Sequence, residues 1–437
     1  MSMDASLSPP ARVLPRLSSL QQATLSLYWF AVNTHWTAIL VVLLPAQVLQ
    51  MAPEEAKGQT VGLILGLGAA VSMVVAPLFG ALSDRVKTRW GRRKPFLVVG
   101  VVGNVVGLVA LAYIPTAGLP SPIPVYVIAF MWVELFNNIA TAPYSALIPD
   151  LVAKEQRGSA SGWLGLMTML GSFAGGVGGL FFGIEALYFF VILVMIAVTL
   201  VCAVSIHEPE PPPARQFRLN EFLATLFSSF QSRDFTWVFL TRLLIVMGVF
   251  TVQEFLQYYL RDTIGGPYEL FGSVVAEQPE QAVSFFITTL LIGAMISSLF
   301  AGILSDRYGR KLMVYIAGGL QGAVVLVFVF YHDYALAVLM GIVFGLGYGA
   351  YESVDWALAS DVLPAEEDYA KDMGVWHVSF TLPQVVALPI AGILLDYFQV
   401  VGRNTGHPNL GYTVIFLIAF AYFVLGTVFV GRIRGVR

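Results

Sequence analysis

The chain has 437 residues, of which 57% are hydrophobic and only 12% are charged, a composition that belongs in a lipid bilayer and not in a soluble protein. Its net charge is −3 and its basic residues are spread over short segments, which excludes the concentrated basic patch of a nucleic-acid-binding protein. The single cysteine, Cys202, excludes disulfides and thiolate metal sites within one copy of the chain.

Twelve apolar runs follow the N-terminal tail, and each is close to the roughly 20 residues that a membrane-spanning helix requires. The sequence therefore predicts an all-α membrane protein with twelve transmembrane helices. The tail at 1–23 contains Arg12 and Arg16 but no apolar stretch followed by a cleavage site, so we expect the first run to be retained as a span. The runs lie near 24–49, 59–83, 95–114, 123–148, 160–183, 186–205, 235–259, 282–304, 312–331, 334–358, 374–397 and 412–431.

The distribution of basic residues predicts the orientation, because Lys and Arg resist translocation across the bilayer. If the N-terminus is cytoplasmic, the inner loops and tails hold 20 of the 24 Lys and Arg residues, and the outer loops hold Lys57, Arg261 and Arg403. The remaining one, Arg242, lies inside the seventh run. We therefore predict a multi-pass protein of the cell membrane, inner or plasma, with both termini cytoplasmic.

In the first run, Trp29, Asn33 and Trp36 share one helical face, whereas His35 lies on another. Asn33 and Trp36 are candidate ligand contacts, since a polar group and a flat ring stand side by side on an otherwise apolar helix. The sequence leaves two roles open for His35, and for His377 in the eleventh run: a hydrogen-bonded structural residue or a proton relay.

A charged loop recurs at equivalent places in the two halves of the chain. The first copy runs from Gly80 through Asp84-Arg85 to Gly91-Arg92-Arg93-Lys94, and the second is Gly302–Lys311. A repeated loop between apolar runs indicates a duplicated membrane carrier with its site between two bundles near the middle of the membrane. The predicted organisation is a tail at 1–23, a six-helix bundle at 24–205, a linker at 206–234, a second six-helix bundle at 235–431 and a tail at 432–437.

The fourth run contains a carboxylate about halfway along its length. Glu134, Asn137, Asn138 and Thr141 fall at i, i+3, i+4 and i+7, which makes one polar stripe on an apolar helix. An acid at this depth is costly and usually faces a cavity, so we predict that Glu134 binds and releases a proton while Asn137 and Asn138 bind the ligand. The alternative is that Glu134 only bridges helices through hydrogen bonds.

The seventh and tenth runs offer comparable stripes. Gln253, Glu254 and Gln257 share a face of the seventh run, and Tyr351 and Glu352 belong to a polar stripe of the tenth. We predict that these five residues contact the ligand; the alternative is a wetted helix end.

Arg242, near these stripes, has an open role. Arg242 pairs either with Glu352 or with Asp355, or its side chain extends towards the inner surface.

The repeated loops suggest a gate. Asp84 and Asp306 lie at the inner ends of helices, where they could pair with nearby arginines and hold the bundles closed on the cytoplasmic side. The candidate partners are Arg85, Arg92, Arg307 and Arg310. Basic loops also fix topology, but topology does not require the aspartates.

Six plus six runs with Gly302–Lys311 between the second and third run of a half resemble the major facilitator superfamily. The first-half version, Ser83–Phe96, is similar to that of the sucrose carriers and, more distantly, of the glycoside-pentoside-hexuronide carriers. The fourth run is similar too, with Glu134 followed by Asn137-Asn138, then Pro143 and Asp150-Leu151. The superfamily resemblance covers the whole chain, and the sucrose-carrier resemblance is strong over 80–151.

The resemblance carries expectations and meets some departures. It implies that the charged loops gate the cytoplasmic side, with Asp150, Arg157 and Asp361 as partners of the network. The sucrose carriers have Asp where this chain has Glu134, Arg where it has Ser145, and an acid near Gln257.

Together these features predict a secondary active transporter, a proton-coupled symporter of a sugar such as a sucrose-like or maltose-like disaccharide or another glycoside. The alternatives are a proton-driven exporter of drugs or metabolites on the same fold and a transporter-like sugar sensor. The expected partners are a sugar, a proton and the lipid bilayer, and we expect a monomer that binds no nucleic acid. We expect no cofactor, metal or enzymatic activity, because the sequence contains no phosphate loop, no His/Glu metal spacing and no nucleophile elbow.

Overall fold

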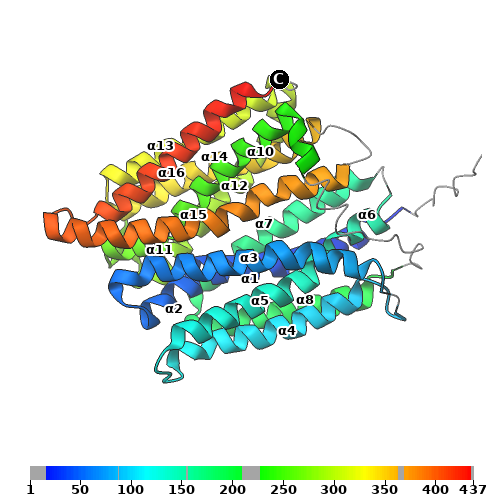
Figure 1. Ribbon diagram of the computed structural model, residues 1–437, viewed down its shortest axis with the longest axis horizontal. Helices are drawn as coiled ribbons and strands as arrows, with labels where there is room; N and C mark the ends of the chain where they lie inside the picture. Colours follow the sequence, from blue (N-terminus) through cyan, green and yellow to red (C-terminus); the bar gives the residue numbers. More distant parts are fainter. Residues whose placement is uncertain (1–15, 87, 154–155, 209–226, 363–368, 435–437) are drawn as a thin grey trace, which may run out of the picture.

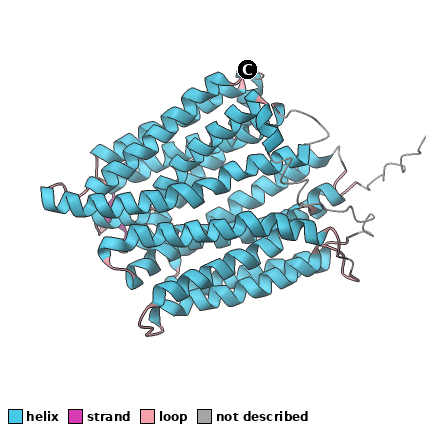
Figure 2. Cartoon of the chain, in the orientation of Figure 1, coloured by secondary structure: helices cyan, strands magenta, loops and turns pink. Residues whose placement is uncertain are grey.

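The computed structural model describes residues 16–86, 88–153, 156–208, 227–362 and 369–434. This part of the chain is helical almost throughout (Figure 2), and twelve of its helices are long and apolar enough to cross a membrane, as the sequence predicted. Helices are favoured in a bilayer because each one satisfies its backbone hydrogen bonds within its own segment.

The described elements divide between the two halves. The first half contains α1 (Ser19–Thr37), the π-helix η1 (Ala38–Leu43), α2 (Leu44–Met51), η2 (Glu54–Ala56), α3 (Lys57–Ser83), α4 (Lys94–Tyr113), η3 (Ile114–Thr116), α5 (Pro122–Ser145), α6 (Leu147–Leu151), α7 (Arg157–Phe181) and α8 (Ile184–Ser205). The second half contains η5 (Phe227–Gln231), α10 (Arg233–Gln253), α11 (Leu256–Tyr259), the π-helix η6 (Leu260–Ile264), β1 (Tyr268–Leu270), β2 (Ser273–Ala276), α12 (Pro279–Tyr308), α13 (Arg310–Phe330), α14 (Tyr334–Asp361), α15 (Tyr369–Thr405), α16 (Leu410–Phe429) and η8 (Val430–Arg432).

The two halves form two bundles that lie side by side (Figure 1), the first coloured blue to teal and the second green to red. Two helix pairs join them, because α3 packs along α15 and α7 packs along α12. Following the predicted orientation, we call the end of the molecule that holds Glu54–Lys57 the outer end and the end that holds Asp84–Lys94 the inner end.

The α3–α15 contact depends on glycines. A Cβ atom at Gly62 would lie only 2.5 Å from the Leu388 carbonyl oxygen, and one at Gly392 would lie 2.1 Å from the Gly58 carbonyl oxygen. Small residues let two helix backbones approach in this way. Both positions lie in the outer half of the molecule, so the bundles are in close contact there.

The seventh span differs from the single helix that its apolar run suggests. It breaks after Gln253, resumes as α11 and ends in the π-helix η6. A two-stranded antiparallel hairpin follows, with Phe271 and Gly272 at its turn at φ values of 51° and 81°. Backbone conformations with positive φ match the twist of a tight hairpin turn, and glycine adopts them readily, which explains the choice of Gly272.

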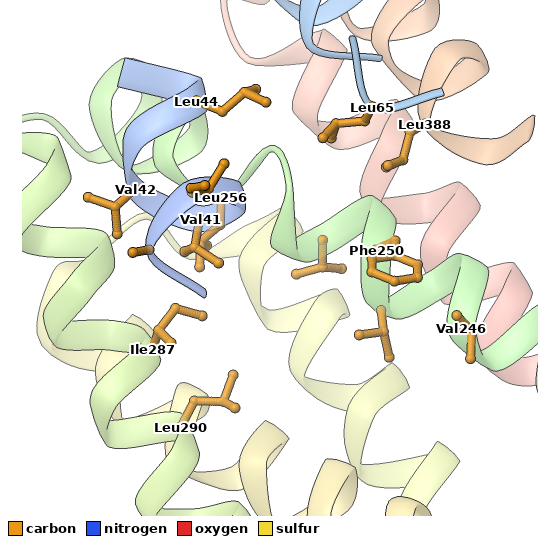
Figure 3. Packing of buried hydrophobic residues seen from close by; sticks show 14 of the residues in the cluster. Val41, Val42, Leu44, Leu65, Val246, Phe250, Leu256, Ile287, Leu290 and Leu388 are labelled. Atoms are coloured by element: carbon orange, nitrogen blue, oxygen red, sulfur yellow. The ribbon is translucent and has the colours of Figure 1, made fainter. Parts of the chain in front are cut away.

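Apolar side chains fill the space between the bundles in the outer half (Figure 3). We call Val41 and Val42 of η1, Leu256 of α11, and Ile287 and Leu290 of α12 the apolar seam. All five are buried. The seam therefore excludes water between the two bundles on this side.

Candidate functional site

Glu134 lies near the middle of α5 and is only 6% exposed. Its carboxylate accepts a hydrogen bond from the Ser72 hydroxyl of α3 at 2.7 Å and one from the Asn138 amide at 3.2 Å. The Asn138 amide also donates to Ser72 at 2.6 Å. Both partners are neutral, so hydrogen bonds and not an opposite charge hold this carboxylate. Sequence analysis missed Ser72, which lies one turn after Gly68 on a neighbouring helix.

The two adjacent amides of α5 have different surroundings. Asn138 is occupied by Glu134 and Ser72, whereas the side-chain oxygen of Asn137 is buried without a hydrogen-bond partner among the described residues. Thr141, the last residue of the predicted stripe, donates to the Asn137 backbone carbonyl at 2.9 Å. Asn137 therefore has an unused acceptor, and the hydroxyl of a ligand is one group that could satisfy it.

The first span lies beside this cluster. The Trp36 ring is half-buried and meets Phe130, one turn before Glu134, at 6.3 Å between ring centroids. The Asn33 amide donates to the Trp29 carbonyl of its own helix at 2.8 Å. His35 is fully buried, and neither of its ring nitrogens has a hydrogen-bond partner in the described part of the chain. The side chain of His377 lies outside the described residues.

The predicted stripe of the seventh span is in contact with the first bundle. Glu254 and Gln257 are each 1% exposed, and Gln253 is half-buried. With its nitrogen as donor, the Gln257 amide lies 3.1 Å from the carbonyl oxygens of both Val41 and Val42. Gln257 thus holds the seventh span against η1.

A buried ion pair lies further towards the inner end of the second bundle. Arg242 Nε is 3.3 Å from Asp355 Oδ2, and the Tyr351 hydroxyl donates to Asp355 Oδ1 at 3.0 Å. The guanidinium carbon is 3.4 Å from the centroid of the Trp376 ring, which is a cation–π arrangement. Among the alternatives considered for Arg242, the structure therefore supports the ion pair with Asp355. Glu352 is half-buried, one turn before Asp355.

At the inner end, the first charged loop pairs within its own bundle. Arg92 lies 3.6 Å from Asp84 and 2.7 Å from Asp150. Arg93, which the sequence analysis did not select, lies 2.6 Å from Asp84 and 3.2 Å from Asp150. The backbone amides of Arg92, Arg93 and Lys94 all donate to the Glu208 carboxylate.

The other predicted gating residues are described only in part. Arg85 and Arg307 are exposed and Arg310 is half-buried. The side chains of Arg157, Asp306 and Asp361 lie outside the described residues, so a gate between the bundles at the inner end stays a prediction.

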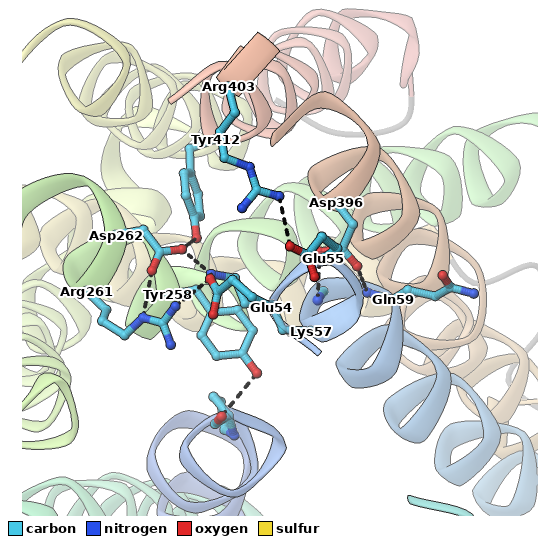
Figure 4. Close-up of polar contacts among 12 residues, drawn as sticks. Glu54, Glu55, Lys57, Gln59, Tyr258, Arg261, Asp262, Asp396, Arg403 and Tyr412 are labelled. Atoms are coloured by element: carbon cyan, nitrogen blue, oxygen red, sulfur yellow. Dashed lines mark hydrogen bonds and ion pairs between the residues drawn. The ribbon is translucent and has the colours of Figure 1, made fainter. Parts of the chain in front are cut away.

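At the outer end, charged residues join the two bundles (Figure 4). Lys57 of α3 pairs with Asp262 of η6 and with Glu54, and Arg261 lies 2.5 Å from Glu54 and 2.7 Å from Asp262. The Tyr412 hydroxyl of α16 also donates to Asp262. We call these five residues the outer latch. Its two basic and two acidic side chains balance.

The latch residues stabilise one another's charges. Burial by itself raises the pKa of Asp262, but the Lys57 ammonium, the Tyr412 hydroxyl and Arg261 together hold that pKa below its usual range. Burial likewise lowers the pKa of Arg261, but Glu54 and Asp262 raise it overall. Arg261 and Asp262 therefore stay ionised at neutral pH.

Two further contacts support the outer latch. The Asp396 carboxylate of α15 accepts from the backbone amides of Gly58 at 3.0 Å and Gln59 at 2.6 Å, at the start of α3. A carboxylate is favourable at a helix N-terminus, where amides lack partners. Arg403 lies 3.6 Å from Glu55 at the surface.

Comparisons with known proteins identify the class of the chain. The family described as MFS/sugar transport protein matches residues 55–431. A sucrose transport protein of Arabidopsis thaliana is 24% identical over an alignment of 281 residues, which covers 54% of this chain and 53% of that protein. A lactose permease of Leuconostoc lactis is 26% identical over 163 residues, covering 35% of this chain and 23% of that protein. The chain thus aligns with about half or less of these two relatives.

A longer alignment connects the chain to a different kind of transporter. The multi-drug resistance efflux pump PmrA of Streptococcus pneumoniae is 25% identical over 376 residues, which cover 83% of this chain and 85% of that protein.

Solved structures share the fold at low sequence identity. A bacterial homolog of the human lysosomal transporter Spinster, in an inward-facing and unoccupied conformation, superposes with a TM-score of 0.69 at 15% identity and covers 95% of this chain and 98% of its own. The nucleoside transporter NupG superposes with a TM-score of 0.67 at 15% identity, with the same coverage of 95% and 98%. These relatives are membrane transporters and not enzymes, as the sequence predicted. The chain belongs to the MFS/sugar transport protein family and is a multi-pass membrane protein.

Proposed function

We propose that this transporter is a proton-coupled sugar symporter that works by alternating access between its two bundles. Glu134 carries the proposal, because it is a buried carboxylate at mid-span whose partners, Ser72 and Asn138, are neutral. Such a group binds a proton when water is excluded and loses it when the surroundings open. The orientation with cytoplasmic termini, the cell membrane as location and the monomeric state remain part of this proposal.

The groups around Glu134 suit a sugar. The buried Asn137 side-chain oxygen has no partner among the described residues, and the half-buried Trp36 offers a flat ring that meets Phe130, one turn before Glu134. A sugar needs both, because its hydroxyls must be matched while its C–H faces stack. The names of the sucrose and lactose relatives support a disaccharide as the substrate.

In the proposed cycle, the empty carrier opens to the outer side, where Glu134 binds a proton and the sugar binds beside it. The outer latch and the apolar seam then close, and the bundles rock to open the inner end. The sugar and the proton leave to the cytoplasm. The structure has its outer end closed. A sugar can shift the equilibrium between the outward-open and inward-open states only if its affinity for the two states differs.

The test uses purified protein in liposomes that hold a pH-sensitive dye. Sucrose, maltose, glucose or buffer is added outside, with Glu134→Gln protein in parallel. We expect a disaccharide to acidify the lumen with the parent protein and not with Glu134→Gln, while the variant retains sugar exchange. Absence of acidification with every sugar would refute symport, and acidification by Glu134→Gln would refute the role of Glu134.

A second candidate function is proton-driven export of drugs or metabolites. The long alignment with the efflux pump PmrA favours it. Export predicts that cells carrying the protein survive toxic compounds better and that no sugar moves protons in liposomes. The same liposomes, loaded with a fluorescent drug instead of challenged with a sugar, distinguish the two functions.

A further inference from the structure

Glu254 differs from the other buried acids among the described residues. It is 1% exposed, and neither of its carboxylate oxygens has a hydrogen-bond partner among the described residues. By contrast, Glu134 accepts from Ser72 and Asn138, and Asp355 is paired with Arg242. An ionised carboxylate without a partner in a protein interior is strongly unfavourable. The burial of Glu254 without a partner, in a structure whose outer end is closed, therefore requires a physical explanation.

The position of Glu254 depends on contact between the bundles. It caps α10, with φ −75° and ψ −23°, in the break before α11, and Gln257 follows it three residues later. Gln257 bonds to the backbone of η1 in the first bundle, and the Tyr258 hydroxyl donates to the Pro45 carbonyl at 3.0 Å. Figure 3 shows Leu256 beside Val41 in the apolar seam. Separating the outer halves of the bundles would therefore bring water to α11 and to the break beside it that holds Glu254.

No described residue offers Glu254 a cation or another hydrogen-bond donor. The η1 and α2 segments contain no ionisable residue, and the Thr288 hydroxyl of α12 is itself without a partner among the described residues. Arg242 of the same helix is twelve residues away, about 18 Å along the axis. Four ionisable groups of the elements that pack on α10 and α11 have partners of their own: Tyr258 donates to Pro45, Asp262 pairs with Lys57, Asp355 pairs with Arg242, and Asp396 accepts from Gly58.

We propose that Glu254 is a second proton-binding site, and that it must take a proton from the outer solution before the apolar seam closes. This inference rests on the alternating access of the proposed function but not on the identity of the substrate. The proton binds a carboxylate oxygen of Glu254 while the seam is open and returns to the outer solution when the seam opens again. Glu254 thus adds no transported proton; it makes outer closure depend on outer pH.

The test measures closure directly, without any sugar. A reporter cysteine replaces Ile287 of the seam in a Cys202→Ser background, and a maleimide is added from outside over a series of pH values. Rates are divided by those of a Ser273→Cys protein, whose exposed cysteine reports the pH dependence of the reagent alone. All proteins carry Glu134→Gln, so that the first proton site does not contribute. Glu269→Gln, an exposed acid changed in the same way, is the matched control.

One carboxylate that must be protonated for closure changes the open-to-closed ratio by up to tenfold per pH unit. We expect the normalised rate to fall by up to this factor as pH is lowered in the parent and in Glu269→Gln. In Glu254→Gln we expect a rate that is low at every pH, because the amide is always neutral. Glu254→Leu, a second neutral variant, should behave in the same way if the amide disturbs folding.

The outcomes separate this inference from the proposed function. A parent-like pH dependence in both Glu254→Gln and Glu254→Leu would overturn the inference, and so would rapid labelling of both at all pH values. A flat, low rate in these variants supports it even if no sugar acidifies liposomes, in which case the symporter proposal alone fails.

Discussion

Replacing Asp262 with Asn should move the protein towards states in which the outer ends of the bundles are apart. The Asp262 side chain is 14% exposed and contacts Lys57 and Arg261, and it accepts from Tyr412. The amide keeps the shape of the carboxylate but removes its charge. Lys57, whose side chain is 3% exposed, then keeps only Glu54 as an acidic partner within the latch.

The magnitude follows from burial. Removing one partner of a fully buried ion pair costs about 3–5 kcal/mol. Because Glu54 still serves Lys57 and because Arg261 reaches solvent, we expect a smaller cost of about 2 kcal/mol. That corresponds to a change of about 30-fold in the ratio of closed to open states.

Maleimide labelling of the Ile287→Cys reporter measures this ratio. If opening is rapid and rare, the labelling rate is proportional to the open fraction, so we expect a rate about 30-fold higher in Asp262→Asn. Glu55→Gln is the matched control at the same end: Glu55 and Arg403 are 59% and 46% exposed and 3.6 Å apart. Such surface pairs contribute about 0.5 kcal/mol, so its rate should change by about twofold.

Equal labelling of the parent and of Asp262→Asn would refute the argument that the latch holds the outer end closed. A double-mutant cycle with Lys57→Met separates direct from indirect effects. If the two residues act through their contact, the double variant should label no faster than the stronger single variant. Additive effects would mean that each residue acts through other partners.

Three further outcomes follow from the structure. Because the pKa of Asp262 is held below its usual range, its stabilisation of the closed outer end should persist down to about pH 4 and be lost below it, which labelling of the reporter at acid pH would detect. Arg242→Gln should lower the free energy of unfolding by about 3–5 kcal/mol, because Asp355 is left buried without its ion pair; thermal melting should show this loss, and Asp355→Asn should partly reverse it. Ser72→Ala should reduce sugar-driven acidification about tenfold, because a hydrogen bond to ionised Glu134 contributes about 1.5 kcal/mol or more, and a parent-like dye signal would contradict its role.

The spans and the central acid could be predicted because each is a local property of the sequence. An apolar run long enough to cross a bilayer forms a helix wherever it packs, so twelve runs gave twelve helices. Glu134 was identifiable because a charge inside such a run is costly and rare. Helical spacing alone also placed Asn138 on the same face of α5 as Glu134, to which it donates a hydrogen bond.

The contacts between helices could not be predicted in this way. Lys57 and Asp262 are 205 residues apart, and no periodicity says which helix ends meet. Lys57, Arg261 and Arg403 entered the sequence argument only as a minority of basic residues on the outer side. A signal was present for Lys57 and Arg261, since Glu54 lies three residues before Lys57 and Asp262 directly follows Arg261. Ser72 was missed for the same reason, because its partner is on another helix.

The outer latch and Glu254 act on the same closed outer end through different physics, which gives a final prediction. The latch pairs two basic with two acidic side chains, whereas the Glu254 carboxylate has no hydrogen-bond partner among the described residues. In the Glu134→Gln background, Asp262→Asn should raise the labelling rate and keep its pH dependence. Adding Glu254→Gln should remove the pH dependence while the effect of about 30-fold from Asp262→Asn remains, because effects at sites without shared partners add. A pH dependence that survives in this combined variant would assign it to a group other than Glu254.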